Sequence, residues 1–133
     1  MLMVDTSVWV DYFNGYPSPE ADYLHDRLVA NDPIVLPGIV MTEILAGLRR
    51  EAEAQRIGDM LAAFDAAPEL TSSDYRSAAA IYRTCRTAGT SIRSVVDCLI
   101  AQICIRHRFE LLSKDKDFAR IARHASLQLV VCG

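Results

Sequence analysis

The sequence predicts an α/β fold in which a mainly parallel central sheet is flanked by helices on both faces. Short apolar runs, too short to be helices, alternate along the chain with longer segments in which apolar residues recur at helical spacing. Strands separated by helices need crossover connections, and these connections produce parallel sheets covered by helices. The chain has 133 residues, of which 51% are hydrophobic and 23% charged, and no linker or repeat divides it. We therefore expect one domain over residues 1–133.

Turn and capping residues place the individual elements. Thr6 or Ser7 is a suitable N-cap for the first helix, and Pro33 and Pro37 bound the second strand. Strands are expected at residues 2–4, 34–36, 69–71, 109–112 and 127–131. The first helix is expected at residues 8–13, and the second follows a turn at 17–19 and ends near residue 31. Further helices are expected at 40–48, 52–64, 74–87, 92–107 and 117–124, with Ser73 or Asp74 as the cap of the helix at 74–87. The helix at 92–107 is the most apolar and should be central.

The charge and the apolar pattern restrict where the protein acts. A net charge of −3 and a pI near 5.5 argue against purely electrostatic attachment to nucleic acid or to an anionic membrane. Asp5 interrupts the first apolar run, so a signal peptide is not expected, and the longest apolar stretch, 95–105, is too short to span a bilayer. We expect a cytoplasmic protein without a membrane partner. Its four cysteines lack CxxC spacing and are interpreted as core residues.

Five acidic residues stand inside or beside apolar sequence, where carboxylates are uncommon. Asp5 closes the first apolar run, Glu43 and Asp97 lie within expected helices, and Asp115 and Asp117 follow the strand at 109–112. An Asp or Glu is almost never fully buried unless it is paired or binds a metal. Because no Lys or Arg stands beside most of these acids in the sequence, a divalent metal is the expected counter-ion.

The predicted topology brings these distant acids together. In open α/β sheets, ligand sites form beyond the carboxyl ends of the strands. Asp5 and Asp115 follow strands directly, and Glu43 and Asp97 lie near the starts of helices that face the same edge of the sheet. Such a cluster would repel itself without a cation. Carboxylate oxygens suit Mg²⁺ or Mn²⁺, whereas zinc favours His and Cys.

Four segments of the sequence resemble the motifs of PIN-domain ribonucleases of the VapC toxin type. They are VDTSVW at residues 4–9, TEILAG at 42–47, RSVVDCLIA at 93–101 and SKDKDF at 113–118. Each segment alone is weak, but the four occur in the expected order and at the expected separations over essentially the whole chain. The fourth departs from the family pattern at Ser113 and Lys114. Asp117, immediately before Phe118, is favoured as the counterpart of the family's last acid, with Asp115 as an additional ligand.

The resemblance implies a metal-dependent endoribonuclease that hydrolyses phosphodiester bonds of cellular RNA, with tRNA or rRNA as expected targets. The implied cofactor is Mg²⁺, for which Mn²⁺ is a possible substitute. Asp5 and Asp97 are expected to be the principal metal ligands, and Glu43 a further ligand or a general base. Asp117 and Asp115 are expected to hold a second ion or its waters.

Two further residues have both a functional and an ordinary structural interpretation. The functional interpretation of Thr6 is a hydrogen bond to substrate phosphate or to the carboxylate of Asp5, and the structural one is a cap of the first helix. The functional interpretation of Arg93 is guidance of a substrate phosphate, and the structural one is an i,i+4 helical pair with Asp97 worth about a few tenths of a kcal/mol. The resemblance also implies two protein partners, a cognate VapB-type antitoxin and a second copy of the chain in a homodimer.

Three other classes of protein are alternatives to this interpretation. A metal-dependent phosphohydrolase with an aspartyl nucleophile usually has two acids close together after the first strand, whereas Asp5 stands alone. A receiver-like signalling module would need a phosphoacceptor Asp after a middle strand and a Lys after a later one, and neither is evident. A non-enzymatic α/β binding module, in which the acids are ordinary surface charges, is distinguished by a metal titration.

Overall fold

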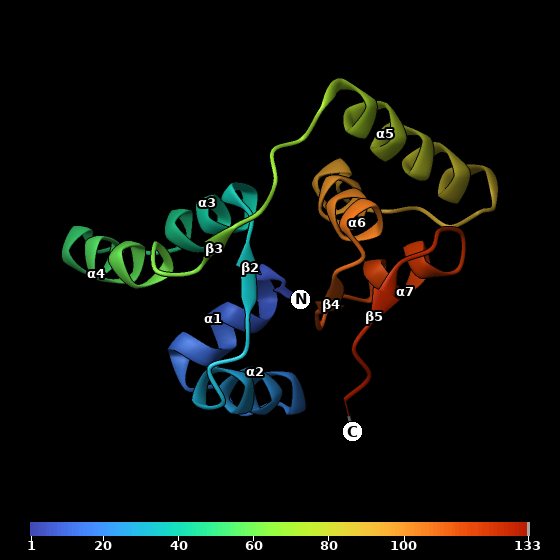
Figure 1. Ribbon diagram of the computed structural model, residues 1–133. Helices are drawn as coiled ribbons and strands as arrows, with labels where there is room; N and C mark the ends of the chain where they lie inside the picture. Colours follow the sequence, from blue (N-terminus) through green and yellow to red (C-terminus); the bar gives the residue numbers. More distant parts are fainter. Residues whose placement is uncertain (133) are drawn as a thin grey trace.

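The computed structural model describes residues 1–132 and has the expected alternation of strands and helices (Figure 1). The strands are β1 (Leu2–Val4), β2 (Ile34–Leu36), β3 (Asp65–Ala66), β4 (Glu110–Leu112) and β5 (Gln128–Leu129). The helices are α1 (Thr6–Asn14), α2 (Pro19–Val29), α3 (Gly38–Ala46), α4 (Glu51–Leu61), α5 (Ser72–Thr87), α6 (Val95–His107) and α7 (Lys116–Ala122). The predicted α/β class is confirmed.

The five strands are parallel and lie in the order β3-β2-β1-β4-β5. β1 is central, with Met3 opposite Val35 of β2 on one side and Leu111 of β4 on the other. The chain runs outward from β1 to β3 and then returns to the other side of β1 as β4. Ligand sites in open α/β sheets form at such a reversal, beyond the carboxyl ends of the strands. The carboxyl ends of β1 and β4 are therefore the place to look for a site.

The helices form two groups. In Figure 1, α1–α4 lie to the left and below, α5–α7 lie to the right, and the strands run between them. Helices within each group pack on one another, with α5 against α6, α1 against α2 and α3, and α6 against α7. None of the helices formed by residues 1–132 combines the length and the apolar composition that a membrane span requires.

The core lies between the sheet and these helices. Trp9 and Phe118, each 1% exposed, are its largest members, and every residue of β1 and β2 is buried. α6 contributes a run of buried side chains, so its predicted central position is confirmed. Three of the four free cysteines are buried core residues, as expected.

The third strand lies earlier in the chain than expected. It is formed by Asp65 and Ala66, which are exposed and pair with Val35 and Leu36 at the edge of the sheet. Their sequence has no apolar pattern, so only the presence of β2 beside them makes them a strand. The expected strand at 69–71 is wrong, because Thr71 is instead the N-cap of α5.

The starts of three helices also differ from expectation. Asp5, rather than Thr6 or Ser7, is the N-cap of α1, and Thr71, rather than Ser73 or Asp74, is the N-cap of α5. α6 begins at Val95 instead of residue 92, because the hydroxyl of Ser94 accepts a hydrogen bond from the N–H of Val96 at 3.1 Å and ends the preceding segment.

The N-terminus of α5 is tied to α6 by a buried acid. Thr71 and Asp74 form a reciprocal capping box. Asp74, 3% exposed, also accepts hydrogen bonds from Gln102 at 3.2 Å and from Arg106 at 2.5 Å. The hydrogen bond from the Thr71 backbone, with those from Gln102, the Thr71 hydroxyl and Arg106, lowers the pKa of Asp74 although burial opposes the change. Asp74 therefore fixes α6, which carries Asp97, against α5.

Candidate active site

Four segments of the chain bring the five predicted acids to one edge of the sheet. Asp5 directly follows β1, and Asp115 and Asp117 stand at the start of α7, just beyond β4. Asp97 lies in the first turn of α6, and Glu43 lies in α3, the helix that follows β2. This arrangement agrees with the prediction that the acids share one edge of the sheet.

Asp5 is 6% exposed and is held by two serines. The hydroxyl groups of Ser7 and Ser113 both donate to its Oδ2 atom, each at 2.9 Å. Its backbone N–H donates to the carbonyl of Leu112 at 2.9 Å, which joins the ends of β1 and β4. Within residues 1–132, no hydrogen bond reaches Oδ1 of Asp5. This oxygen is fixed in position and available to a cation.

Asp97, Asp115 and Asp117 form the centre of the cluster. One carboxylate oxygen of each lies within 4.8 Å of those of the other two. The side chain of Asp97 is half-buried and, among the described residues, receives no hydrogen bond and forms no ion pair. Its carboxylate therefore depends on a cation or a proton from outside the protein.

The pKa of Asp97 reports how the acids converge. Burial raises this pKa, and the negative charges of Asp115, Asp5, Asp117 and Glu43 raise it further, to about 7. The four other predicted acids thus act together on one carboxylate. A bound cation would reverse the effect, because it would favour the ionised form of Asp97.

Asp117, unlike Asp97, is surrounded by hydrogen-bond donors and positive charge. It is fully buried, and its Oδ2 atom accepts hydrogen bonds from the backbone N–H of Arg93 at 3.2 Å and from Nε of Arg93 at 3.4 Å. Nη1 of Arg120 donates to Oδ1 at 2.6 Å. Burial raises the pKa of Asp117, but the hydrogen bonds from Arg93 and Arg120 outweigh it, and the pKa is lowered. The counter-charges of Asp117 therefore come from the protein itself.

Arg93 also binds Asp115. Its Nη2 atom lies 3.3 and 3.4 Å from the two carboxylate oxygens of Asp115. Arg93 precedes α6, and its ion pairs are with Asp115 and Asp117 rather than with Asp97, so the predicted helical pair between Arg93 and Asp97 is wrong. Asp115 is half-buried, and its Oδ1 atom also accepts the backbone N–H of Asp117 at 2.9 Å as the N-cap of α7.

Thr6 connects the cluster to Glu43. Its hydroxyl donates to Oε1 of Glu43 at 2.8 Å, so it neither bonds the Asp5 carboxylate nor caps α1. Glu43 is exposed at the edge of the site, and its Oε2 atom has no hydrogen-bond partner among residues 1–132. Glu43 is thus oriented through one oxygen, while the other makes no hydrogen bond within the described residues.

Three important contacts were not predicted from the sequence. Ser7 and Ser113 hold Asp5, and Arg120 pairs with Asp117. The spacing of Arg120, three residues after Asp117 in one helix, is a readable signal for an ion pair. Ser113 lies 108 residues from Asp5, and only the pairing of β1 with β4 brings the two together.

The donor set fits a hard divalent cation. All the candidate donors are carboxylate oxygens, as Mg²⁺ and Mn²⁺ prefer. Oδ1 of Asp5 and the whole carboxylate of Asp97 lack partners within residues 1–132, and the charges around Asp97 are mutually repulsive. These observations favour a metal at Asp97, beside Asp115.

Comparisons with known proteins identify the family of this chain. A sequence profile of the PIN domain matches residues 2–124. Ribonuclease VapC11 of Mycobacterium tuberculosis is 35% identical over 130 residues, which cover 96% of each chain. VapC ribonuclease Mb1587 of Mycobacterium bovis matches equally well, at 35% identity over 96% of each chain. The chain therefore belongs to the PIN domain family, and within that family to the VapC ribonucleases.

Solved structures share the fold. A chain of VapBC2 from Rickettsia felis superposes with a TM-score of 0.75 at 21% identity, covering 97% of this chain and 96% of that chain. A chain of a toxin-antitoxin complex from Klebsiella pneumoniae gives a TM-score of 0.72 at 21% identity, covering 98% and 97%. At these identities the comparison concerns the fold alone.

Proposed function

We propose that this chain is a metal-dependent endoribonuclease that hydrolyses phosphodiester bonds of cellular RNA, with tRNA or rRNA as its targets. The observation that carries the proposal is the half-buried Asp97 carboxylate, which has no protein partner within residues 1–132 and is surrounded by four other acids. The family membership and the ribonuclease names of the relatives support the same activity. The proposed ribonuclease domain spans residues 1–133.

We assign the metal to Asp5, Asp97 and Asp115, with Mg²⁺ as the proposed ion and Mn²⁺ as a substitute. When bound, the ion would neutralise charge on the phosphoryl oxygens and activate water. Oδ1 of Asp5 is free to coordinate because both serine hydroxyls occupy Oδ2. Arg93 donates to both carboxylates, but Asp115 is half-buried, whereas Asp117 is fully buried and is also bound by Arg120 at 2.6 Å. Asp117 therefore acts mainly by holding Arg93 and Arg120, which reverses the preference based on its place before Phe118.

Glu43 is the proposed general base or additional ligand. The Thr6 hydroxyl fixes its Oε1 atom, and Oε2 is left to accept a proton from an attacking water. The position of Glu43 at the exposed edge of the site would allow substrate to approach between α3 and α7. Arg93 is the proposed contact for substrate phosphate, and the 79% exposure of its side chain supports this role.

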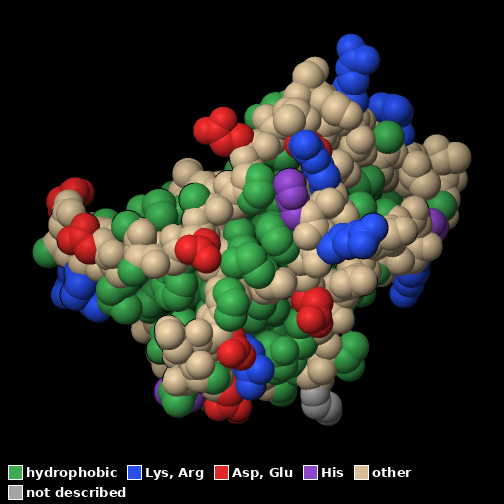
Figure 2. Space-filling view, in the orientation of Figure 1, with side chains coloured by type: hydrophobic (Ala, Val, Ile, Leu, Met, Phe, Trp, Pro, Cys, Tyr) green, Lys and Arg blue, Asp and Glu red, His purple; other side chains and the backbone are tan. Residues whose placement is uncertain are grey.

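A VapB-type antitoxin is the proposed inhibitor, in keeping with the toxin-antitoxin complex among the structural neighbours. A basic side chain of that partner could pair with Asp5, Glu43 or Asp97 and compete with the metal. Hydrophobic side chains form an area over α4 and over α3, the helix that carries Glu43 (Figure 2). This area would receive apolar residues of the same partner.

RNA cleavage tests the proposal. Purified protein should cleave a labelled RNA in Mg²⁺ and stop when the metal is chelated. Asp5→Asn and Asp97→Asn should each lower the rate by at least about 100-fold, because each removes a negatively charged ligand. Asp26→Asn, an exposed substitution in α2, is the matched control and should cleave normally. Full cleavage in chelator, or full activity of Asp97→Asn, would reject the proposed mechanism.

A further inference from the structure

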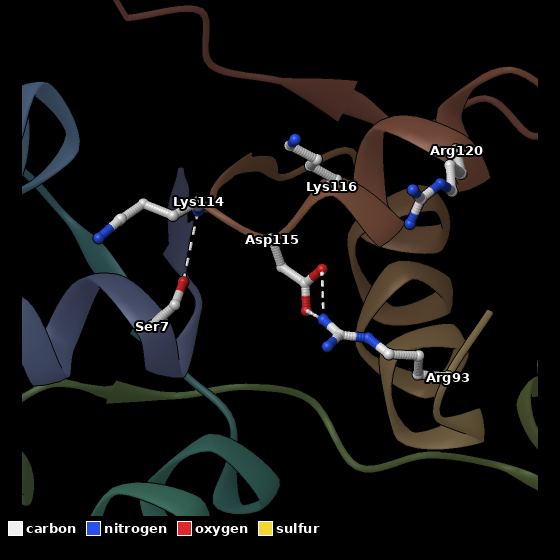
Figure 3. A pocket seen from close by; sticks show the side chains of 6 residues that line it. All are labelled: Ser7, Arg93, Lys114, Asp115, Lys116 and Arg120. Carbon is white, nitrogen blue, oxygen red and sulfur yellow. Dashed lines mark hydrogen bonds and ion pairs between the residues drawn. The ribbon is translucent and has the colours of Figure 1, made fainter.

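A basic pocket adjoins the acidic cluster. It has a volume of about 550 Å³, within the range of about 300–1,000 Å³ typical of ligand pockets. Its lining residues are Ser7, Arg93, Lys114, Asp115, Lys116 and Arg120 (Figure 3). Four of these six side chains are cationic, although the whole chain has a net charge of −3. Positive charge is therefore concentrated at one side of the proposed metal site.

The two arginines have donors to spare. Arg93 uses Nε and Nη2 for Asp117 and Asp115, and within residues 1–132 its Nη1 atom makes no hydrogen bond. Arg120 uses only Nη1, for Asp117. Their side chains are 79% and 41% exposed, so the unused guanidinium donors are accessible to a ligand. Asp117 thus orients both groups without saturating them.

The two lysines differ from each other. Nζ of Lys114 forms an ion pair with Asp11 and lies 5.2 Å from the ring centroid of Tyr16, and in Figure 3 its side chain extends away from Asp115. Lys116 is exposed and forms no ion pair among the described residues. In Figure 3 it lies above Asp115, whereas Arg93 approaches Asp115 from below. Lys116 is thus a positive charge at the rim of the pocket without an ion-pair partner among the described residues.

We propose that this pocket binds a backbone phosphate of the RNA next to the scissile phosphodiester, with Lys116, Arg93 and Arg120 as its donors. The proposal rests on the proposed ribonuclease function. Arginine guanidinium groups and lysine ammonium groups are the usual hydrogen-bond donors to phosphate in proteins. The two arginines here are already held in position by Asp117. An anion would avoid the carboxylates themselves, so the basic side of the site is where a flanking phosphate can lie. Contacts of this kind position RNA without reading its sequence.

The proposal predicts that the RNA strand approaches the carboxylates from the basic side of the site. RNA would pass over α7, with Lys116 in its first turn and Arg120 in its last, and reach the carboxylates through Arg93. Removing Lys116 should then weaken binding of all RNA sequences to a similar extent. The slope of log affinity against log salt should become shallower by about 0.7, the value for one phosphate contact on a single strand.

The test measures binding of a fluorescent 12-nucleotide RNA in chelator at several salt concentrations. Lys116→Ala is compared with Arg123→Ala, which removes one exposed positive charge at the other end of α7 and which forms no ion pair among residues 1–132. Lys116→Ala should bind about fivefold more weakly at low salt, with the shallower slope, and Lys116→Glu more weakly still. Arg123→Ala should behave as the wild type.

The outcomes separate this inference from the proposed function. Wild-type binding and slope in Lys116→Ala, in a protein that cleaves RNA with Mg²⁺, would overturn the phosphate pocket and leave the ribonuclease proposal standing. An equal loss in Lys116→Ala and Arg123→Ala would also overturn it, because only net charge would matter. If the wild type failed to cleave RNA, the ribonuclease proposal would fail, and the chelated binding data would still decide the pocket.

Discussion

Asp97 and Asp117 have carboxylate oxygens within 4.8 Å of each other, yet their surroundings push their pKa values in opposite directions. Asp97 has acidic neighbours and no basic partner, whereas Asp117 has hydrogen bonds from two arginines. The same residue type can therefore serve as a metal ligand at one position and as a structural anchor at the next. Substitutions at the two positions should have different consequences.

Asp97→Asn should stabilise the metal-free protein at neutral and alkaline pH. The pKa of Asp97 is 3.8 in its unperturbed state and about 7 in the fold, so the unfolded chain loses this proton first as pH rises. The stabilising effect of the raised pKa of Asp97 is therefore lost between about pH 4 and pH 7, and the effect of Asp97 on stability does not change further above that range. Three pKa units would correspond to about 4 kcal/mol, which solvent screening at this half-buried site reduces to about 1–2 kcal/mol.

Urea unfolding in chelator measures this effect. The free energy of unfolding of Asp97→Asn should exceed that of the wild type at pH 8 and match it near pH 4. A variant less stable than the wild type at pH 8 would mean that Asp97 has a structural hydrogen-bonding role.

Asp115→Asn and Asp117→Asn should separate activity from stability. Asp115→Asn should lose cleavage with little change in the free energy of unfolding, because its amide can still cap α7. Asp117→Asn should cost about 2 kcal/mol, because it weakens hydrogen bonds from two arginines to a buried carboxylate. Parallel cleavage rates and urea midpoints give both quantities. Equal losses of stability in the two variants would contradict the distinction.

At the scale of elements, the orientation of α6 decides where Asp97 lies. Asp74 connects the start of α5 with Arg106 and Gln102 near the end of α6. Because the pKa of Asp74 is lowered in the fold, its stabilising contribution is complete above the unfolded value of 3.8 and declines as pH falls below it.

Asp74→Asn should therefore lower the melting temperature by several degrees at pH 7, and the difference from the wild type should shrink as pH falls below about 4. Differential scanning calorimetry of this variant, with Asp26→Asn as the exposed control, checks the prediction. A difference that persisted unchanged at pH 2 would show that the charge of Asp74 is not responsible.

Elements were predictable where local sequence determines them. The apolar runs of β1 and β2 and the long helix α6 are visible in the sequence because their own residues are buried. β3 was misplaced because its two exposed residues become a strand only through pairing with β2. The helix caps were displaced by a residue or two, because several adjacent Ser, Thr and Asp residues are all suitable caps and tertiary contacts select one.

The acids of the site were predictable, but most of what holds them was not. Asp5 and Asp115 stand directly after strands, so the topology alone places them at one edge. The Ser113 contact with Asp5 depends on the register between β1 and β4, and the Arg93 contact with Asp117 depends on how α6 and α7 pack. Neither register nor helix packing can be read from residue types.

At the scale of the whole molecule, we predict a homodimer, in which two acidic sites would lie along one RNA path. Several large hydrophobic side chains are exposed on the single chain, including Val95 at 57% and Tyr75 at 54%. Light scattering at micromolar concentration should give a mass of about twice the 14.8 kDa chain. A monomer with full ribonuclease activity would contradict this prediction.

The central claim, that the carboxylate cluster is a divalent metal site, is tested most directly by calorimetric titration of Mn²⁺ into the metal-free protein. At pH 7 the wild type should bind Mn²⁺ and release close to half a proton per site, because Asp97, with a pKa of about 7, is half protonated beforehand. Measurements in buffers of different ionisation enthalpy give that proton count. Asp97→Asn should bind at least about tenfold more weakly and release no proton. Equal affinity in Asp97→Asn and the wild type would contradict the claim.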